Sequence, residues 1–280
     1  MTNIIASHWA IAGDSYPGCG NEVSEFPFAA RMEAAAKAGY RGAGFVYEDL
    51  MAQARTLGYA EMSRILEANG LVDIEVEILT DWFATGDRRA ASDKIRADLL
   101  AAAEGLKARH IKISGDFALG DWSLDHLASE FAGLCAQARE VGSMVGLEIM
   151  PFTNFNSIQN TLPVIQAAGA ENGGLLLDIW HMQRGKVDLQ EIGTLPKGSI
   201  VSIEINDALP TIEGDLWNDT LHHRLLCGEG CFDIPTFLNE VKKTGYNGPV
   251  GIEVISATHR KLPLDVAAQS AMASVRKYID

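Results

Sequence analysis

The 280-residue chain has no hydrophobic run long enough to cross a membrane, and it is poor in positive charge. No segment approaches the ~20 consecutive apolar residues that a membrane-spanning helix requires. Lysine and arginine together number 23 against 37 aspartates and glutamates, which leaves a net charge of −14. Such an excess of negative charge repels phosphate backbones and anionic lipid surfaces. We therefore expect neither nucleic acid nor a membrane as a partner.

Cysteine is also scarce, and the four present form no recognisable framework: Cys19, Cys135, Cys227 and Cys231. Small secreted domains depend on denser disulfide networks. A structural zinc site usually combines two close pairs of ligands, and the last two cysteines have no second pair nearby. The opening stretch, MTNIIASHWA, lacks the basic flank and long apolar core of a signal peptide. We expect a cytoplasmic protein that is not built on disulfides.

Two common nucleotide-binding motifs are missing as well. No G-x-G-x-x-G pattern follows the first predicted strand, and the glycine-containing stretch GDFALGDW does not have the spacing of a phosphate-binding loop. Neither a dinucleotide cofactor nor a nucleoside triphosphate is therefore indicated by a motif.

What the chain does have is a regular alternation of two patterns. Short runs of β-branched and aliphatic residues are typical of buried strands. They predict strands at residues 3–10, 40–50, 71–83, 109–117, 146–152, 173–180, 199–207 and 247–256. Segments with the apolar spacing of helices follow these runs, at 26–40, 50–70, 89–108, 124–142, 157–168, 189–192, 234–246 and 263–279.

Eight strand-and-helix units thus follow one another, joined by short glycine-containing turns such as AGYRG and TGYNGP. Alternation of this kind indicates a parallel sheet covered by helices. Eight units are the number that closes a barrel, which typically needs roughly 250 residues. No change in composition marks a linker between domains. The sequence therefore predicts an α/β protein with a single (β/α)8 TIM-barrel domain over residues 1–280.

Four of the predicted strands carry a carboxylate near their C-terminal ends. The stretches are GLEIMPF with Glu148, LLLDIWHM with Asp178, IVSIEIND with Glu204 and PVGIEVIS with Glu253. Successive side chains of a strand point to opposite faces. In each stretch the aliphatic neighbours share one face and the acid points to the other. The four acids are therefore expected to face the barrel axis near its C-terminal mouth, where barrel enzymes keep their active sites.

An ionised carboxylate rarely stays buried without a partner of opposite charge. One interpretation is that the acids pair with buried bases, and Lys112 points inward on its strand by the same alternation. The inward acids outnumber the inward bases, so we favour a divalent metal ion. Its expected ligands are Glu148, Asp178, Glu204 and Glu253. Oxygen ligands suit Mn²⁺ or Mg²⁺, with Co²⁺ or Zn²⁺ as alternatives.

Several motifs in the second half of the chain also resemble those of a known family. They are the D-x-x-H spacing of Asp178 and His181, the preceding GLEIMPF, the later IEINDA and GIEVIS, and the Gly-Glu-Gly pattern at residues 228–230. In these motifs and in their order, the chain resembles the xylose-isomerase-like TIM barrels, a superfamily of sugar-phosphate isomerases and epimerases. The similarity covers all eight units, and its specific motifs lie in strands five to eight.

This resemblance implies roles for the residues at matching positions. It makes Glu148, Asp178 and Glu253 metal ligands. It makes His181 either a substrate contact or a residue that contacts the metal ligands without binding the metal itself.

The remaining ligand position departs from the family pattern. Many relatives have a histidine on strand seven and some have an amide, whereas this chain has Glu204. A fourth acidic ligand would make the site bind cations more strongly. The alternative is that Glu204 is not a ligand and that His222 or His223, in the long connection after the strand, takes its place.

Other polar residues lie near predicted strand ends. Lys112 either polarises a substrate oxygen or neutralises the acids. Arg224 either binds a substrate carboxylate or phosphate or lies on the surface. His8 is a candidate to line the pocket, and at least one of Glu75 and Glu77 is expected to reach the mouth. Three tryptophans either wall a sugar ring or pack in the core: Trp9, Trp82 and Trp180.

The chemistry implied by the resemblance is proton transfer next to a carbonyl. A carboxylate can remove such a proton near neutral pH when a metal stabilises the developing enolate oxygen. In ketose epimerases of the superfamily, the glutamates of strands five and eight take and return the proton, and these match Glu148 and Glu253. We therefore expect a metal-dependent isomerase or epimerase acting on a sugar or polyol-derived ketone, in a chain that can also form a homo-oligomer.

Three alternatives remain open. Inosose and 3-dehydroshikimate dehydratases share this scaffold and expel a hydroxyl group, for which His181 or Lys112 would be the acid. The apurinic endonuclease branch needs extra metal-binding histidines and a basic groove, which seven histidines and a charge of −14 do not favour. A noncatalytic sugar-binding barrel would require that the acids pair with bases and that no metal is held.

Overall fold

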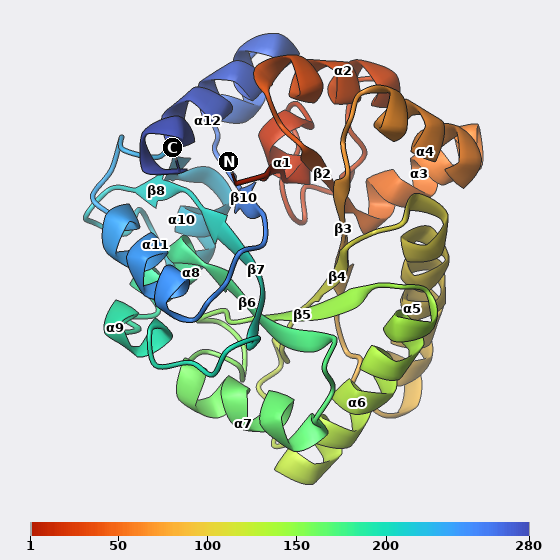
Figure 1. Cartoon of the computed structure of the whole chain (residues 1–280), viewed down its shortest axis with the longest axis vertical. Coiled ribbons are helices and arrows are strands. Elements are labelled where there is room, and N and C mark those ends of the chain that lie inside the picture. Colours follow the sequence, from red (N-terminus) through yellow and green to blue (C-terminus); the bar gives the residue numbers. More distant parts are fainter. Residues whose placement is uncertain (1, 280) are drawn as a thin grey trace.

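The eight predicted strands form one closed, all-parallel barrel (Figure 1). The structure is a computed structural model that describes residues 2–279. Around the barrel the strands follow in the order β1, β10, β7, β6, β5, β4, β3, β2, and each neighbouring pair is parallel. Their bounds are β1 Ile4–Ala6, β2 Gly42–Val46, β3 Asp73–Leu79, β4 His110–Ile113, β5 Met144–Glu148, β6 Gly173–Asp178, β7 Ile200–Ile205 and β10 Val250–Ile252. The predicted single (β/α)8 barrel is confirmed.

Helices cover the outside of this barrel (Figure 1). They are α2 Phe28–Ala38, α3 Tyr47–Leu57, α4 Tyr59–Ala68, α5 Gly86–Leu106, α6 Leu124–Glu140, α7 Ile158–Ala168, α9 Leu189–Ile192, α11 Ile234–Lys243 and α12 Leu264–Ile279. Their apolar faces pack on the strands, and Leu99, Phe131 and Phe237 are fully buried there. A typical helix end is Gly39, whose φ of 107° closes α2 in the left-handed region that glycine tolerates. Across residues 2–279, none of the helices combines the length and apolar character needed to traverse a bilayer.

The predicted strand at 173–180 ends earlier than expected. The chain leaves the sheet after Asp178 and continues directly as α8, Ile179–Arg184. The Asp178 carboxylate accepts a hydrogen bond from the backbone N–H of Trp180 at 2.6 Å and so caps the new helix. This local cap outweighs the strand preference of the isoleucine and tryptophan that follow it.

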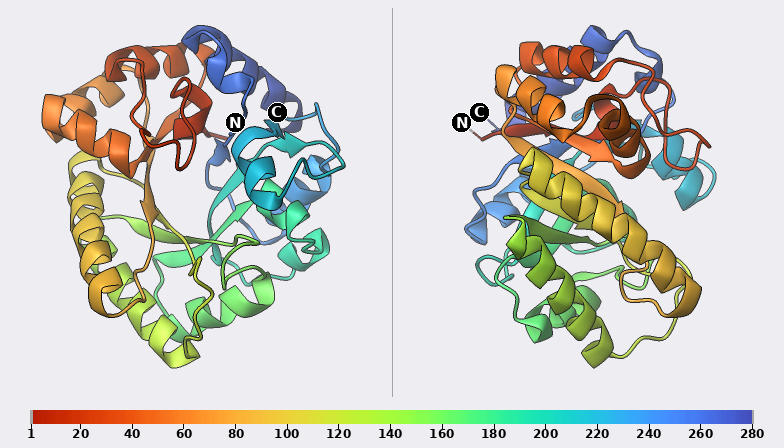
Figure 2. Two further views of the ribbon diagram at one scale, coloured as in Figure 1. Left: turned by 180° about the vertical axis from the view of Figure 1, so that it is seen from behind. Right: turned by 90° about the vertical axis from the view of Figure 1, so that its right-hand side faces the viewer.

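Three other regions also contain short elements that the sequence patterns did not predict. The predicted strand at 3–10 ends as β1 and turns into α1, His8–Ile11. The long connection after β7 contains a two-stranded hairpin and a helix: β8 Asp207–Ala208, α10 Leu216–His222 and β9 Arg224–Leu225. A single turn of 3₁₀ helix, η1 His259–Lys261, precedes α12. In the side view of Figure 2, α10 and the loop after α1 project at the same end of the barrel.

The predicted inward and outward faces of the strands are confirmed by contacts across the barrel. Lys112 of β4 and Glu204 of β7 form an ion pair at 2.7 Å, although β5 and β6 separate their strands in the barrel order. Both side chains must therefore point to the axis. The outward neighbours Leu147, Leu177 and Ile203 belong to the hydrophobic core beneath the helices.

Two inward-facing glycines leave room for these acids. A Cβ on Gly44 of β2 would lie 2.4 Å from Oε1 of Glu75, and one on Gly251 of β10 would lie 2.8 Å from Cγ of Glu204. Both distances are shorter than van der Waals contact, so any other residue would displace the acid. The barrel interior therefore holds carboxylates where ordinary barrels hold layers of branched apolar side chains.

A second buried polar group lies beside the barrel, at the start of α1. Nε2 of His8 donates a hydrogen bond to the carbonyl oxygen of Glu22 at 3.1 Å, and Nδ1 lies 3.8 Å from Oδ2 of Asp49. Arg31 of α2 donates to the same Asp49 oxygen at 2.6 Å. Burial, followed by the nearby Arg31 charge, lowers the pKa of His8 to about 3. The neutral imidazole thus joins the loop after α1 to the helices α2 and α3.

Replacing His8 by glutamine should make stability less sensitive to acid. An unfolded histidine binds a proton below about pH 6.5, whereas buried His8 stays neutral down to about pH 3. The unfolded state therefore binds more protons in this window. The free energy of unfolding should fall by about 1.4 kcal/mol per pH unit because of this residue as the pH decreases.

Urea titrations at about pH 7 and about pH 5 measure that pH dependence for both proteins. The variant should lose less stability between the two conditions, whatever its stability at neutral pH. Equal losses would show that His8 takes up its proton in the folded protein.

Candidate metal centre at the barrel mouth

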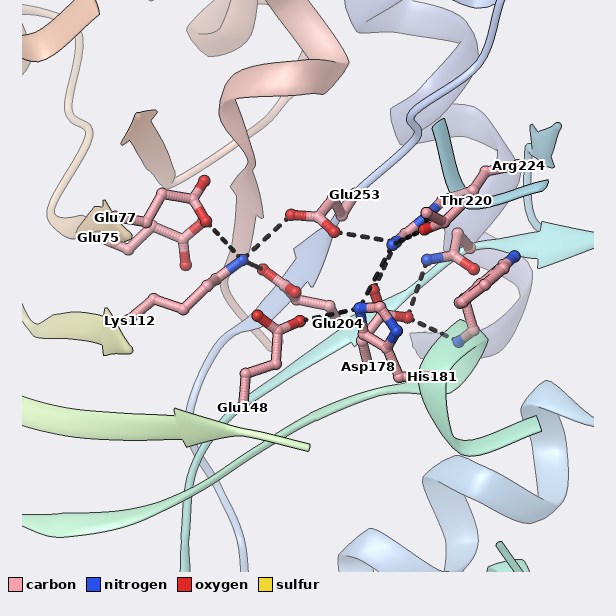
Figure 3. Close-up of polar contacts among 12 residues, drawn as sticks. Glu75, Glu77, Lys112, Glu148, Asp178, His181, Glu204, Thr220, Arg224 and Glu253 are labelled. Carbon is pink, nitrogen blue, oxygen red and sulfur yellow. Dashed lines mark hydrogen bonds and ion pairs between the residues drawn. The ribbon is translucent and has the colours of Figure 1, made fainter. Parts of the chain in front are cut away.

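Four carboxylates converge at the C-terminal mouth of the barrel (Figure 3). Glu148 and Asp178 end β5 and β6, Glu204 lies next to the end of β7, and Glu253 directly follows β10. One ligand atom of each lies within 4.8 Å of those of the other three. None of the four residues is more than 4% exposed. The structure therefore brings together the acids that strand alternation placed on the inner face.

Lys112 lies in the middle of this cluster. Its Nζ is 2.7 Å from Oε1 of Glu204, 2.8 Å from Oε2 of Glu77 and 3.1 Å from Oε1 of Glu253 (Figure 3). Burial alone would lower the pKa of this lysine, but the surrounding carboxylates, Glu204 first, raise its pKa well above the usual value. Lys112 is therefore permanently charged and neutralises part of the cluster.

Arg224 of β9 supplies the second positive charge. One guanidinium nitrogen donates to Asp178 at 2.5 Å and to Glu253 at 2.9 Å. The hydroxyl of Thr220, on α10, accepts from the other side of the guanidinium at 2.9 Å. Burial acts against the charge, yet Asp178 and Glu253 outweigh it and raise the pKa of Arg224. Arg224 is thus a buried ion-pair partner, and it does not lie on the surface.

His181 lies beside the carboxylates because α8 begins at Asp178. With Asp178 as the cap, His181 is in the first turn of the helix and on the same side. Its Nε2 lies 3.3 Å from Oε1 of Glu148 and 3.5 Å from a guanidinium nitrogen of Arg224. The D-x-x-H spacing therefore has a geometric reason: it places both side chains at the mouth.

A second polar pair lies deeper in the barrel, beneath the carboxylates of the mouth. His110 of β4 and Glu75 of β3 are fully buried, with Nε2 and Oε2 3.2 Å apart. Burial lowers the pKa of His110. Burial would raise the pKa of Glu75, but the contact with His110 and the nearby Lys112 charge lower it. Of the two strand-three acids, Glu77 lines the mouth and Glu75 lies beneath it.

The two cations do not balance the acids around them. Six buried carboxylates share this interior: Glu75, Glu77, Glu148, Asp178, Glu204 and Glu253. Burial, followed by the neighbouring Glu253, raises the pKa of Glu204 well above its usual value. Burial also raises the pKa of Glu77 to about 8, against the opposing effect of Lys112. The centre therefore carries more negative charge than its own bases neutralise.

Two carboxylate oxygens of the centre also lack a hydrogen-bond partner: Oε1 of Glu148 and Oε2 of Glu204. Oxygens that already accept one hydrogen bond keep a second lone pair. Uncompensated charge and free oxygen donors are what a hard divalent cation requires. The residues therefore fit such an ion, and they would hold it through Glu148, Asp178, Glu204 and Glu253.

A cavity of about 170 Å³ opens above these carboxylates. Five of the predicted site residues line it: Lys112, Glu148, His181, Arg224 and Glu253. Trp9 lines it too, whereas Trp82 and Trp180 are fully buried core residues.

Three histidines proposed from the sequence lie elsewhere. His8 does not line the cavity, because α1 turns its ring toward Asp49. His222 contacts Arg260 at 3.1 Å and packs edge-on against Tyr16, and His223 pairs with Ser256 through its backbone. The structure therefore does not support either as a replacement for Glu204, which lies with the other acids.

The sequence patterns did not single out several residues that line the cavity: Phe117, Phe152, Trp217 and Thr220. Two of them lie on α10, which begins where the carboxylate of Asp215 accepts a hydrogen bond from the N–H of Asn218. An aspartate followed by LWNDTLHH is a recognisable helix start. That signal was available, and so was one for the two phenylalanines, which end the predicted strands 109–117 and 146–152.

Asp207 organises the hairpin loop that carries Arg224. Its carboxylate is 1% exposed. It accepts four backbone N–H groups at 2.8 to 3.0 Å, those of Ala208, Gly228, Gly230 and Phe232. The Gly-Glu-Gly pattern thus closes the loop around a buried carboxylate, which fixes the strand on which Arg224 lies.

Replacing Glu204 by glutamine should weaken divalent-metal binding without destabilising the metal-free protein. The amide removes one crowded charge, and its carbonyl oxygen can still accept from Lys112. We expect affinity for Mn²⁺ to fall about tenfold or more, measured by calorimetric titration and by the thermal shift with metal. Glu104→Gln, on the exposed side of α5, is the control. A strongly destabilised metal-free Glu204→Gln would instead make Glu204 a structural partner of Lys112.

Replacing Asp207 by asparagine should loosen the hairpin loop. An amide offers one acceptor oxygen, so two of the four N–H groups would face an NH₂ group. Each buried unsatisfied donor costs about 1–3 kcal/mol. Urea unfolding should show that loss, and hydrogen exchange at Gly228 and Gly230 should accelerate. Asp233→Asn, at the start of α11, is the control because asparagine caps helices equally well. Unchanged exchange at both glycines would contradict the role of Asp207.

Comparison with known proteins finds a matching family model and several similar enzymes. A family model described as xylose isomerase-like TIM barrel matches residues 32–278. A 3-dehydroshikimate dehydratase of Pseudomonas aeruginosa is 30% identical over 159 residues, which are 56% of this chain and 25% of that protein. An inosose isomerase of Bacillus subtilis is 23% identical over 136 residues, or 48% of each chain. The chain therefore spans a quarter to a half of the length of these curated relatives.

Solved structures show the same fold over the whole chain. An IolI protein with a bound zinc atom superimposes with a TM-score of 0.83 at 16% identity, covering 100% of both chains. A D-psicose 3-epimerase studied with D-fructose has a TM-score of 0.76 at 13% identity, covering 100% of this chain and 99% of the other. The family model covers most of the sequence and the barrel matches throughout, so the chain belongs to the xylose isomerase-like TIM barrel family.

Proposed function

We propose that this chain is a divalent-metal-dependent enzyme that removes a proton next to the carbonyl group of a sugar or polyol-derived ketone and returns it as an isomerase or epimerase. Its relatives are isomerases, epimerases and dehydratases. All of these reactions can begin with the same proton abstraction. The residue that would take this proton is therefore the central group of the site.

The observation that carries the proposal is the free oxygen of Glu148. Its carboxylate lines the cavity, and Oε1 has no hydrogen-bond partner. Most other acidic oxygens at the mouth are held by Lys112 or Arg224. A general base must have a lone pair that faces the substrate. Glu148 meets this requirement: Nε2 of His181 contacts Oε1 at 3.3 Å without forming a hydrogen bond to it.

A divalent ion such as Mn²⁺ or Mg²⁺ would act as a Lewis acid that stabilises the developing enolate oxygen. The four acids of the centre would hold it, and Lys112, whose N–H groups already face Glu77, Glu204 and Glu253, would keep these carboxylates in place. The zinc atom of one structural neighbour is compatible with this use of the site.

Glu253 is the second carboxylate that lines the cavity. Its two oxygens accept from Lys112 at 3.1 Å and from Arg224 at 2.9 Å. These cations fix its orientation. In an isomerase or epimerase, Glu148 would keep the proton that it removes, and Glu253 in its protonated form would donate its own proton at the other face of the substrate or at the neighbouring carbon.

A dehydratase is the second candidate, favoured by one observation. Two curated relatives, at 30% and 28% identity, are 3-dehydroshikimate dehydratases. Loss of a hydroxyl group needs a proton donor instead of a second base. His181 and Lys112 both line the cavity and both carry N–H groups. Because Lys112 stays charged, His181 would protonate the departing hydroxyl after Glu148 has taken the first proton.

Glu148→Gln should keep the fold and lose proton transfer, since an amide cannot accept a proton. The loss should be at least ~10²–10⁴-fold, the usual contribution of a general base. Candidate substrates are D-psicose, an inosose and 3-dehydroshikimate, incubated in D₂O with Mn²⁺. Magnetic resonance should show deuterium next to the carbonyl with the native protein and none with the variant. The exposed acid variant Glu33→Gln is the control.

The reaction products distinguish an isomerase or epimerase from a dehydratase. Exchange with return of an isomeric ketone supports an isomerase or epimerase, and Glu253→Gln should then block the return step. Release of water with a new conjugated absorbance supports a dehydratase. Turnover without exchange or cleavage of that C–H bond would exclude both, because each begins by removing this proton.

A further inference from the structure

Three aromatic side chains form a continuous surface along one side of the cavity, which we call the aromatic wall: Phe117, Phe152 and Trp217. Phe152 and Trp217 are stacked, with ring centres 4.5 Å apart and planes at 12°. Phe117 continues the wall from Trp217 at 5.8 Å. At the inner end, Phe152 meets the ring of His181 edge-on at 5.7 Å. The wall therefore leads from the metal centre to the rim.

The outer part of this wall is open to solvent. Phe117 is 41% exposed and Trp217 is 47% exposed, whereas most large apolar side chains of the barrel are buried. The three residues come from the loop after β4, the loop after β5 and α10, so separate segments contribute to one surface. Exposed aromatic surface gathered at a cavity mouth commonly marks a ligand-binding surface.

The rim of the cavity offers no free positive charge. Among residues 2–279, Lys112 and Arg224 are the lysine and arginine side chains that line it, and both lie at its base in ion pairs with carboxylates. The charged residue nearer the opening is Glu22, in the loop after α1. A phosphate group needs cationic or backbone N–H donors. Here it would meet aromatic rings and a carboxylate.

From this wall and this charge distribution we infer that the enzyme selects a substrate without a phosphate group. The end that reacts lies at the carboxylates, and the far end packs its C–H surface against Phe117 and Trp217. Sugars that carry a phosphate at the far end are rejected, because desolvating that group beside the wall and Glu22 is not compensated. The inference deepens the proposed function and rests on it for which end of the substrate lies inward.

A matched pair of probes tests this selection: D-fructose and D-fructose 6-phosphate, which differ only in a phosphate far from the carbonyl. Dissociation constants are measured by calorimetry with Mn²⁺ on the Glu148→Gln background, where no turnover occurs. We expect the neutral sugar to bind at least about tenfold more tightly, and Trp217→Ala to weaken its binding about tenfold. Val266→Ala removes an equally exposed side chain, at 47%, from the outer helix α12 and should change neither constant.

A gain-of-function variant makes the test sharper. Phe117→Arg places a guanidinium at the rim, where it can pair with a phosphate. The preference should then shift toward the phosphorylated sugar by about tenfold or more. Native preference for the phosphorylated sugar, or a ratio that Phe117→Arg leaves unchanged, would overturn the inference.

An exposed aromatic surface can also be a contact between copies of the chain. Sedimentation of the same variants tests this alternative. If Trp217→Ala changes the oligomeric state and leaves both dissociation constants unchanged, the wall is a contact between copies of the chain and the inference is overturned. Failure of the proposed function has a different signature, namely the absence of deuterium exchange in the native protein with any substrate.

Discussion

The excess of buried negative charge at the barrel mouth is the constraint on which the rest of the site depends. Ionised carboxylates lose several kcal/mol each when they leave water without compensation. Lys112 and Arg224 compensate part of this cost, and each does so by contacting two or more acids at once. Raised pKa values at Glu77 and Glu204 show that compensation is incomplete. Such a cluster favours a further cation, and that cation would then stabilise a developing enolate oxygen.

The barrel can carry this charge because its surroundings are rigid. Gly44 and Gly251 admit acids into the interior, where any Cβ would collide with them. Arg224 comes from a hairpin outside the barrel, and four N–H groups around Asp207 hold that hairpin in place. Thr220 fixes the other side of the guanidinium. Arg224 is therefore positioned by segments that follow β7, so the long connection after this strand is part of the centre.

Much of this could be predicted from sequence, because two regular periods govern it. The two-residue period of strands put the acids on the inner face, and the count of alternating units indicated a closed barrel. The predictions failed where short-range hydrogen bonds override those periods. Asp178 caps α8 within what looked like a strand, and α1 turns His8 away from the cavity. The partners of Arg224 were also beyond prediction, since they depend on how a loop folds back over the mouth.

The cavity is divided into two regions with different chemistry. Its base holds charged groups, and one side of its mouth is aromatic. Under the proposed function, the charged groups would act on the carbonyl and the adjacent C–H bond, which many ketones share. The wall of Phe117, Phe152 and Trp217 would contact the part of the substrate that does not react. Because these residues lie on loops and α10 outside the sheet, substitutions there would change which substrate fits without moving the acids on the strands.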